Sequence, residues 1–385
     1  MRYIWQHINT ILESYSGKVP LTHYLRHYFK QYPKLGSRDR KILSDMAYSW
    51  YRASRAISNT QLSIEEKIGC LLLLCTHQPK YLQDFLPAQW QIAPNAPVTE
   101  RIALLQEYLR LNIDDIYGHS TSLSYGINRE EWLSSMLSQP RLFIRVRKDM
   151  NKVLQLLEQH SLSYEMMSDT CIALPNGAAI DKILPEDVYV VQDASSQSTG
   201  AYFHPEPQQQ WFDCCAGAGG KSLLLKDIEP TVKLSVSDKR KSILHNLETR
   251  FQQYHHAIPA SYCVDAADKQ QLYAHLHNST FDAVICDVPC SGSGTWARTP
   301  EQLYFFDQHF LKDISQQQKA IATNVAHYIK KGGKLIYITC SVFKEENEDV
   351  VMEVMEKTGL QLESLQLING IAQGADSMFV AVMQK

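Results

Sequence analysis

Two cysteines stand where a thiol could attack a substrate. Cys290 lies in the stretch D-V-P-C-S-G (287–292), and Cys340 lies in T-C-S (339–341). Each follows a short apolar segment that is typical of a buried strand. A lone cysteine usually serves as a small buried apolar residue. Two cysteines that each end a strand of one parallel sheet would meet at the same edge, so this pair is the candidate reactive centre.

Methylation at carbon 5 of a pyrimidine base is one reaction that uses such thiols. That carbon is a poor nucleophile until a thiolate adds to carbon 6 and makes the ring enamine-like. An acid near ring nitrogen 3 would stabilise the charge that develops on the base. Asp287, three residues before Cys290, is the candidate if it carries or shares a proton.

A glycine-rich stretch, C-C-A-G-A-G-G-K (214–221), follows another predicted strand. Its glycines allow positive φ and a close approach of the backbone to a ligand. A helix predicted from Ser222 would offer free N–H groups at its start. The spacing matches neither the G-x-x-x-x-G-K-[ST] loop nor the G-x-G-x-x-G dinucleotide motif. The stretch therefore indicates a ligand loop of a different kind, or simply a tight turn.

Three predicted strands end in an aspartate, namely Asp238, Asp265 and Asp287. Open α/β sheets bind ligands at this edge. We expect Asp238 to hold ribose hydroxyls and Asp265 to meet an adenine edge. A nucleoside cofactor without a pyrophosphate, such as S-adenosylmethionine, suits the glycine loop and these acids. Any one of the aspartates could equally cap a turn.

Strand and helix patterns alternate from residue 191 onward, which is typical of a doubly wound sheet. We predict helices after Ser222, through Asn246 and over Ile314–Ile329, the last ended by a turn at Gly332–Gly333. The predicted strands are Trp211–Phe212, Leu234–Val236, Tyr262–Val264, Ala283–Cys286 and Leu335–Ile338.

The part of the chain before residue 191 divides in two. Apolar residues recur at helical spacing over 1–118, which predicts an all-helical domain. Residues 119–190 form a small α/β unit with strands at Leu142–Val146 and Tyr189–Val191 around a helix at Lys152–Gln159. The predicted domains are therefore 1–118, 119–190 and 191–385.

Charge is unevenly distributed along the 385 residues. The formal net charge is −3, yet residues 1–60 hold ten Lys and Arg against three Asp and Glu. Such asymmetry points to an anionic partner at one end, although a solvated helical surface explains it equally well. Cations interleaved with tyrosine and tryptophan favour RNA. The candidate cations are Arg26, Lys30, Lys34, Arg38, Arg40, Lys41, Arg52 and Arg55.

The nine cysteines do not form a disulfide framework or a zinc motif. They are odd in number and widely spaced, with no C-x-x-C pair and no H-x-x-x-H pattern. The first residues do not resemble a signal peptide, and the longest apolar run, at 69–75, is too short to span a bilayer. We expect a cytoplasmic protein, monomeric by default, with no metal and no membrane contact.

The motifs taken together resemble the RsmB/Sun family of RNA cytosine-5 methyltransferases. The matching stretches cover most of 190–350 in the family's order. The segment S-R-D-R (37–40) and the helix after it resemble the NusB-like RNA-binding domain that often precedes the catalytic domain. The resemblance implies a Rossmann-like class I S-adenosylmethionine-dependent domain. The stretches are Q-D-A-S-S-Q (192–197), D-C-C-A-G-A-G-G-K-S (213–222), V-D-A (264–266), D-V-P-C-S-G-S-G (287–294) and 332–348.

The resemblance also implies roles for individual residues. Cys340 would be the nucleophile, and Cys290 would assist release of the methylated base from the covalent adduct. The family loop is usually A-A-P-G-G-K, so this chain lacks the proline at Ala218, and Ile243 stands where an arginine is common. Arg240 is a candidate substitute for that arginine. The implied S-adenosylmethionine ligands are Cys215, Ala216, Gly217, Ala218, Gly219, Gly220, Lys221, Asp238, Asp265 and Asp287.

Several other functions compete with this one. A DNA cytosine-5 methyltransferase would attack with Cys290 and would need no T-C-S motif. A zinc deaminase requires P-C-x-x-C, and Ser293 excludes it. A ribosome-assembly factor that binds RNA without catalysis is the alternative of another class. Small-subunit ribosomal RNA is the favoured substrate, and transfer RNA remains open.

Phosphate contacts are expected beside the active site. The target cytosine must leave its stack to reach the thiols. Arg298 and the basic strand Arg145-Val146-Arg147-Lys148 could then hold RNA phosphate, or could simply be solvated surface.

Overall fold

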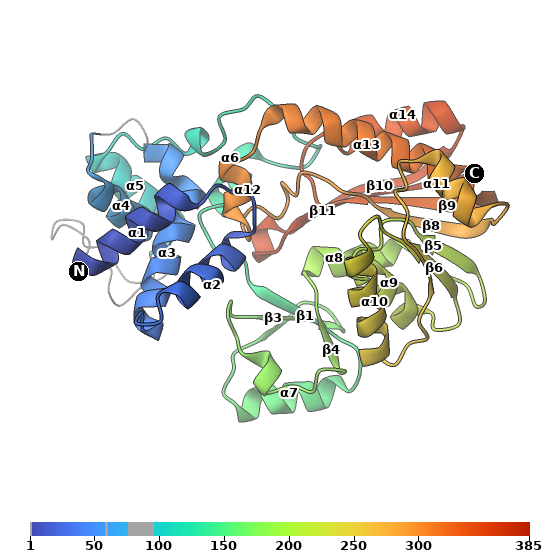
Figure 1. The fold of residues 1–385 in the computed structure, drawn as a ribbon, viewed down its shortest axis with the longest axis horizontal. Coiled ribbons are helices and arrows are strands. Elements are labelled where there is room, and N and C mark those ends of the chain that lie inside the picture. The colour runs from blue at the N-terminus through green and yellow to red at the C-terminus, as the bar shows by residue number, and fades with distance from the viewer. Residues whose placement is uncertain (1, 58–60, 76–95) are drawn as a thin grey trace. The chain divides into compact units, whose positions relative to one another are not determined.

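The computed structural model describes residues 2–57, 61–75 and 96–385 (Figure 1). Residue contacts group the chain into two compact units. The helical unit contains residues 1–120, 128–140 and 295–307, and the sheet unit contains 121–127, 141–294 and 308–385. The predicted domain boundaries at 118 and 190 stay a proposal.

The described part of the helical unit is built from short helices, as predicted for the N-terminal region. The apolar stripes of its first three helices form the core, in which Ile8, Leu25, Leu43 and Met46 are buried. The helices are α1 (Arg2–Ser14), α2 (Leu21–Gln31), α3 (Ser37–Ala53), α4 (Ile64–Cys75), α5 (Val98–Tyr108), α6 (Arg129–Ser135) and α12 (Pro300–Tyr304), with 3-10 turns η1 (Ser54–Ile57) and η4 (Ile113–Tyr117).

Residues 295–307 follow the Cys290 loop in sequence but pack inside the helical unit. Helix α2 has Pro20 at its N-cap and no side-chain cap, and Glu301 instead accepts the Leu21 N–H at 3.0 Å. Gly17 has φ +75°, and a Cβ there would lie 2.5 Å from the Phe305 ring. The segment therefore supplies part of the helical core.

The sheet unit contains a seven-stranded sheet in the order β10-β11-β9-β8-β5-β6-β7. Strands β5 to β9 pair in parallel, whereas β10 and β11 are antiparallel to their neighbours. The chain leaves β5 in one direction through β6 and returns on the other side through β8, which makes a ligand-binding switch point. The predicted Rossmann-like fold is confirmed. The strands are β5 (Gln210–Asp213), β6 (Lys233–Ser237), β7 (Ala260–Tyr262), β8 (Phe281–Asp287), β9 (Ile329–Thr339), β10 (Gln361–Asn369) and β11 (Ser377–Gln384).

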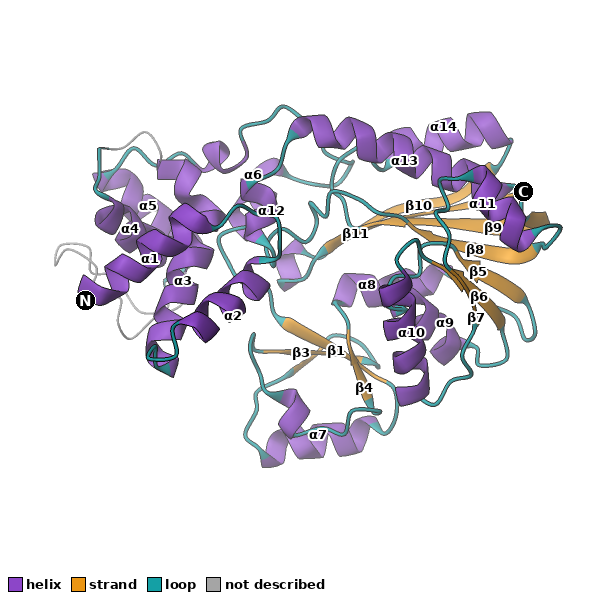
Figure 2. Cartoon of the chain, viewed as in Figure 1, coloured by secondary structure: helices purple, strands orange, loops and turns teal. Residues whose placement is uncertain are grey.

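Helices cover both faces of this sheet (Figure 2). Helices α9 (Gly220–Ile228) and α10 (Lys241–Gln253) pack on one face against Ile285 and Ile336. Helices α11 (Lys269–Leu276), α13 (Gln308–Ala326) and α14 (Glu348–Thr358) pack on the other against Val284 and Tyr337. Alternate residues of each strand thus enter opposite cores. Among the described ranges, no helix is both long and apolar enough to cross a membrane.

A smaller antiparallel sheet precedes the large one in sequence, in the order β2-β3-β1-β4. Strands β1 (Leu142–Val146) and β4 (Tyr189–Val191) and helix α7 (Met150–Gln159) match the predicted elements closely. Strands β2 (Glu165–Met166) and β3 (Cys171–Leu174) were not predicted, and α8 (Ala194–Ser198) leads to the large sheet.

Two predicted boundaries are wrong. Helix α13 ends at Ala326, and Gly332–Gly333 lie inside β9 rather than after a helix. Gly332 has φ +79°, and a Cβ on Gly333 would lie 2.7 Å from the Asp282 carbonyl oxygen, so the glycines form an irregular stretch of strand. Strand β7 ends at Tyr262, which leaves Asp265 in the following loop.

Candidate active site

The structure brings the two predicted cysteines together at the carboxyl edge of the large sheet. Cys290 follows β8 and Cys340 follows β9, two adjacent parallel strands. Their sulfur atoms lie 3.1 Å apart, and the Cys340 N–H donates to the Cys290 Sγ at 3.4 Å. The hydrogen bond with Cys340, together with burial, raises the pKa of the Cys290 thiol well above its ordinary value. Cys290 is therefore suited to holding a proton.

The loop that carries Cys290 packs directly on the loop that carries Cys340. The Gly294 N–H donates to the Cys340 carbonyl oxygen at 2.9 Å. A Cβ on Gly294 would lie 2.1 Å from the Ser377 carbonyl oxygen, so only glycine fits this approach. The second glycine of the S-G-S-G segment thus helps to keep the two thiols close.

The glycine-rich stretch forms the turn from β5 into α9. Gly217 and Gly219 both have positive φ, +52° and +81°, and Gly219 is the N-cap of α9. A Cβ on Gly219 would lie 2.9 Å from Leu247 of α10. The turn therefore needs glycine at position 219 both for its backbone conformation and for its packing.

Asp238 follows β6 and is tied to the glycine turn. Its carboxylate accepts the Gly217 N–H at 3.1 Å and three N–H groups of Arg240 at 2.9–3.1 Å. Burial opposes ionisation, but the bonds from Arg240 outweigh it and lower the pKa of Asp238. Arg240 thus occupies a definite place in the site as the partner of Asp238.

Asp265 also lies at this edge, and it is half-buried in the loop after β7. Its Oδ1 accepts the Ala267 N–H at 3.0 Å, and its own N–H donates to Gln271 at 3.1 Å. Asp265 therefore caps a turn, which is the alternative role that the sequence left open for each aspartate.

Asp287 ends β8 and faces Lys221 of α9. The Lys221 Nζ lies 3.5 Å from the Asp287 Oδ2 and donates to Ser196 Oγ at 2.7 Å. Lys221 is buried, whereas the Asp287 side chain is 31% exposed. The predicted acid thus sits beside a buried cation, and both lie where the glycine loop meets the strand that leads to Cys290.

Asp213, the last residue of β5, is a site residue that sequence reasoning missed. It is buried, its Oδ2 accepts from Ser222 Oγ at 2.6 Å, and in the described part of the chain its Oδ1 has no hydrogen-bond partner. Burial raises the pKa of Asp213 to about 7, and the neighbouring Asp287 adds to that rise. Its position at a strand end, directly before the glycine-rich stretch, was the available signal.

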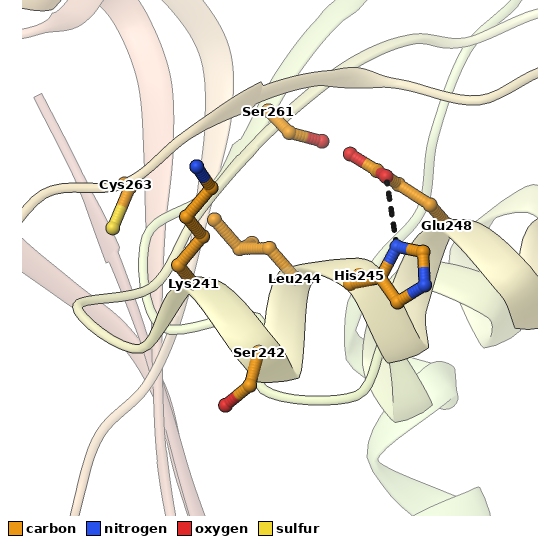
Figure 3. A pocket seen from close by; sticks show the side chains of 7 residues that line it. All are labelled: Lys241, Ser242, Leu244, His245, Glu248, Ser261 and Cys263. Atoms are coloured by element: carbon orange, nitrogen blue, oxygen red, sulfur yellow. Dashed lines mark ion pairs between the residues drawn. The ribbon is translucent and has the colours of Figure 1, made fainter.

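An open pocket of about 520 Å³ lies between the start of α10 and the end of β7 (Figure 3). His245 and Glu248 face each other across part of it, with 3.9 Å between Nδ1 and Oε2. The predicted site residues do not line this pocket. Its lining residues are Lys241, Ser242, Leu244, His245, Glu248, Ser261 and Cys263.

The expectation that the strand Arg145–Lys148 holds RNA phosphate is wrong for its two arginines. The Arg145 Nη1 lies 2.5 Å from Asp227 Oδ2, and the Arg147 Nη2 lies 2.7 Å from Asp227 Oδ1. Both guanidinium groups are buried, with side chains 6% and 4% exposed. They join β1 to the helix α9 and are occupied within the protein.

Three of the candidate cations of the helical unit are also used internally. Arg52 is buried and donates to the Met136 carbonyl oxygen at 2.7 Å. Arg55 lies over the Tyr304 ring, 5.1 Å from its centroid. Arg40 is half-buried and donates to the Leu35 carbonyl oxygen at 2.8 Å. Exposed positions remain at Arg26, Lys30, Lys34, Arg38 and Lys41.

Comparison with known proteins gives a consistent picture. Residues 201–382 match the family described as 16S rRNA methyltransferase RsmB/F. The chain is 26% identical over 241 residues to ribosomal RNA small subunit methyltransferase B of Shewanella oneidensis, covering 61% of this chain and 55% of that protein. It is 32% identical over 168 residues to the protein of the same name from Xylella fastidiosa, covering 44% and 39%. The chain spans about half the length of the first of these relatives.

Two solved structures share the fold. PH0851 has a TM-score of 0.70 at 19% identity, with 95% of each chain covered. The structure described as NSun6 from Pyrococcus horikoshii with SFG has a TM-score of 0.59 at 15% identity, covering 73% of this chain and 97% of that one. At these identities the likeness concerns the fold alone.

Proposed function

We propose that this chain, whose residues 201–382 match the 16S rRNA methyltransferase RsmB/F family, is an S-adenosylmethionine-dependent enzyme that methylates carbon 5 of a cytosine in RNA. The observation that carries the proposal is the pair of thiols 3.1 Å apart at the switch-point edge of the sheet. Small-subunit ribosomal RNA is the proposed substrate, because the curated relatives carry that RNA in their names.

The residues that follow or end β5, β6, β7 and β8 fit S-adenosylmethionine. Asp238 would hold the ribose hydroxyls and Asp265 the adenine edge, with the backbone at Gly217–Gly220 against the ligand. The buried, unpartnered oxygen of Asp213 is a polar atom at the same edge that a ligand donor could satisfy. When bound, the cofactor supplies an electrophilic methyl group.

The two thiols take different parts in the reaction. Cys340, as thiolate, forms a bond to carbon 6 of the cytosine, while Asp287 or its partner Lys221 stabilises charge at ring nitrogen 3. Carbon 5 then takes the methyl group. A base removes the carbon 5 proton, the bond between carbon 6 and sulfur breaks, and Cys340 leaves as thiolate. Cys290, whose raised pKa keeps it protonated, assists this release by donating its S–H hydrogen bond to the departing Cys340 thiolate, 3.1 Å away.

The RNA partner is proposed to contact the helical unit as well. The exposed cations of α2 and the start of α3 can neutralise phosphates. The target base must leave its stack before it reaches the thiols. A cytoplasmic monomer remains the expectation for the protein that carries this site.

The test uses the full chain, S-adenosylmethionine and in vitro transcribed 16S ribosomal RNA, with transfer RNA as the competing substrate. Cys290→Ala should accumulate a protein–RNA adduct on a denaturing gel, and Cys340→Ala should lose both adduct and methylation. Cys263→Ser, which changes an exposed cysteine, is the matched control and should behave as wild type. An active Cys340→Ala variant overturns the proposal. A wild-type protein that binds RNA and never transfers methyl groups favours the assembly-factor alternative.

A further inference from the structure

Glu346 is a fully buried carboxylate between the two cysteine loops. Its Oε1 accepts the Ser291 N–H at 2.7 Å and the Gln318 side-chain amide at 2.9 Å. Its Oε2 accepts the Ser291 hydroxyl at 2.5 Å and the Ser341 hydroxyl. One side chain therefore receives four hydrogen bonds, which come from the Cys290 loop, the Cys340 loop and helix α13.

The donors are the immediate neighbours of the two cysteines. Ser291 follows Cys290 in the sequence, and Ser341 follows Cys340. Gln318 also donates to the carbonyl oxygen of Pro289, the residue before Cys290, at 2.9 Å. Glu346 thus holds the residue that follows each thiol, through the Ser291 backbone and hydroxyl on one side and the Ser341 hydroxyl on the other.

Further hydrogen bonds hold the Cys340 loop around this carboxylate. The Ser293 hydroxyl lies 3.0 Å from the Ser341 hydroxyl and accepts the Val342 N–H at 2.9 Å. Asn347 accepts from the Thr339 hydroxyl at 2.5 Å and donates to the Ser341 carbonyl oxygen at 2.9 Å. Each residue next to Cys340 is therefore held by a buried partner.

A carboxylate is chemically suited to this position. Two acceptor oxygens with four lone-pair sites can receive all four donors, whereas the glutamine amide has one oxygen and adds two donors. In the described part of the chain, Glu346 makes no ion pair with a lysine or arginine. Burial of a charge is costly, so only a complete set of donors retains it there. The free-energy cost of burying this carboxylate is better explained by a need to hold the two cysteine loops in place than by a gain in stability.

We propose that Glu346 is a positioning residue that sets Cys290 against Cys340, so that both thiols reach the same cytosine ring. The inference rests on the proposed function for its chemical consequence, because two thiols need this spacing only if they act on one base. The geometric part of the proposal is that the Glu346 carboxylate sets the distance between the two sulfur atoms. This part depends only on the hydrogen bonds described above, whatever the reaction is.

The test measures that distance chemically and needs no RNA. Dibromobimane cross-links thiols a few ångströms apart, and mass spectrometry of the digested protein reports the Cys290–Cys340 cross-link. We expect the rate of cross-linking in Glu346→Ala to fall by about tenfold or more, because its four donors lose their acceptor. Glu346→Gln should lie between this variant and wild type. Binding of S-adenosylmethionine, measured by calorimetry, should be unchanged within about threefold, since this carboxylate lies outside the cofactor ligands.

Glu345→Ala is the matched control, since Glu345 is the preceding glutamate and, among the described residues, its Oε1 accepts one hydrogen bond, from the Ser122 N–H at 3.3 Å. It should cross-link at the wild-type rate. If Glu346→Ala does not fold, the double variant Ser291→Ala with Ser341→Ala removes both hydroxyl donors and tests the same contacts. Wild-type cross-linking in a folded Glu346→Ala protein, or in that double variant, overturns the proposal.

A second readout separates this proposal from the proposed function. With 16S ribosomal RNA, Glu346→Ala should retain both thiols and yet accumulate covalent adduct, because Cys290 is displaced from the position in which it assists release. If slow cross-linking is observed but no adduct forms even in Cys290→Ala, the positioning role stands and the cytosine-5 chemistry fails. Adduct release at the wild-type rate in Glu346→Ala would contradict the positioning role.

Discussion

The carboxyl edge of the large sheet has two halves that hold their carboxylates in different ways. In the cofactor half, Asp238 pairs with Arg240, and Asp287 lies 3.5 Å from Lys221. In the thiol half, the described residues that donate to Glu346 are all neutral. A cation cancels the field of a carboxylate, whereas neutral donors leave its negative charge in place. The pKa of Cys290 is raised by its hydrogen bond with Cys340 and by burial, and the negative charge of Glu346 raises it further.

This difference assigns a protonation state to one group in each half. In the cofactor half, the bonds from Arg240 lower the pKa of Asp238, so this carboxylate stays ionised and can bind polar groups of a ligand. In the thiol half, the raised pKa keeps Cys290 protonated beside Cys340, the proposed nucleophile. The two halves meet at Asp287, where the same strand leads from the Lys221 pair to the Cys290 loop.

The largest effect is expected at that junction. Asp287→Asn removes both the partner of Lys221 and the candidate acid, so methyl transfer to RNA should fall by about 10²–10⁴-fold. Asp282→Asn, at the opposite end of β8, breaks the ion pair with Lys330 and is the matched control. It should retain methyl transfer within a few fold. Asp287→Asn with wild-type methyl transfer would show that the two halves work independently.

A second experiment tests the unusual member of the cofactor half. Asp213 has a folded-state pKa of about 7, above its ordinary value of 3.8, so the folded state binds more protons between these pH values. Stability therefore falls as pH rises from about 4 to 7, and the loss is complete above pH 7. Asp213→Asn escapes this loss, so its stability relative to wild type should increase with pH, by at most about 4 kcal/mol. Urea denaturation at pH 5 and pH 8 measures the change, and a difference that does not vary with pH would contradict it.

The smallest effect concerns the glycine turn that carries the cofactor half. Gly219→Ala should lower the free energy of unfolding by about 2–4 kcal/mol, because alanine is strained at positive φ and its Cβ would press against Leu247. Gly359→Ala, also at positive φ but with open space around it, should cost only about 1–2 kcal/mol. Thermal denaturation of both variants separates the two contributions. Equal losses would mean that the contact with Leu247 carries no penalty.

The sequence allowed the Rossmann-like fold and its central strands to be predicted, because both follow local patterns, whereas the cytosine-5 chemistry stays a prediction. Apolar runs ended by Asp287, Asp238 or a cysteine marked the carboxyl edge, and the structure places these residues there. Strands β10 and β11 were missed, since an antiparallel pair at a sheet edge depends on long-range pairing rather than on a motif.

Other features depend on contacts between residues far apart in sequence. Arg145 and Arg147 look like surface cations until Asp227, about 80 residues away, is seen to bind them. Glu346 lies in a charged stretch typical of an exposed helix start, yet it is buried and accepts from Ser291 of the Cys290 loop and Ser341 of the Cys340 loop. Residues 295–307 belong to the helical core through Glu301, whose partner is 280 residues earlier.

The central claim is that Cys340 attacks the base and Cys290 does not. It is tested most directly with the wild-type chain, S-adenosylmethionine and 16S ribosomal RNA that contains 5-fluorocytosine. Fluorine at carbon 5 blocks the proton removal that releases the base, so the covalent adduct should persist. After nuclease and protease digestion, tandem mass spectrometry should find the modified nucleotide on the peptide that contains Cys340. A nucleotide on Cys290, or no adduct while methylation of unmodified RNA proceeds, would contradict the account.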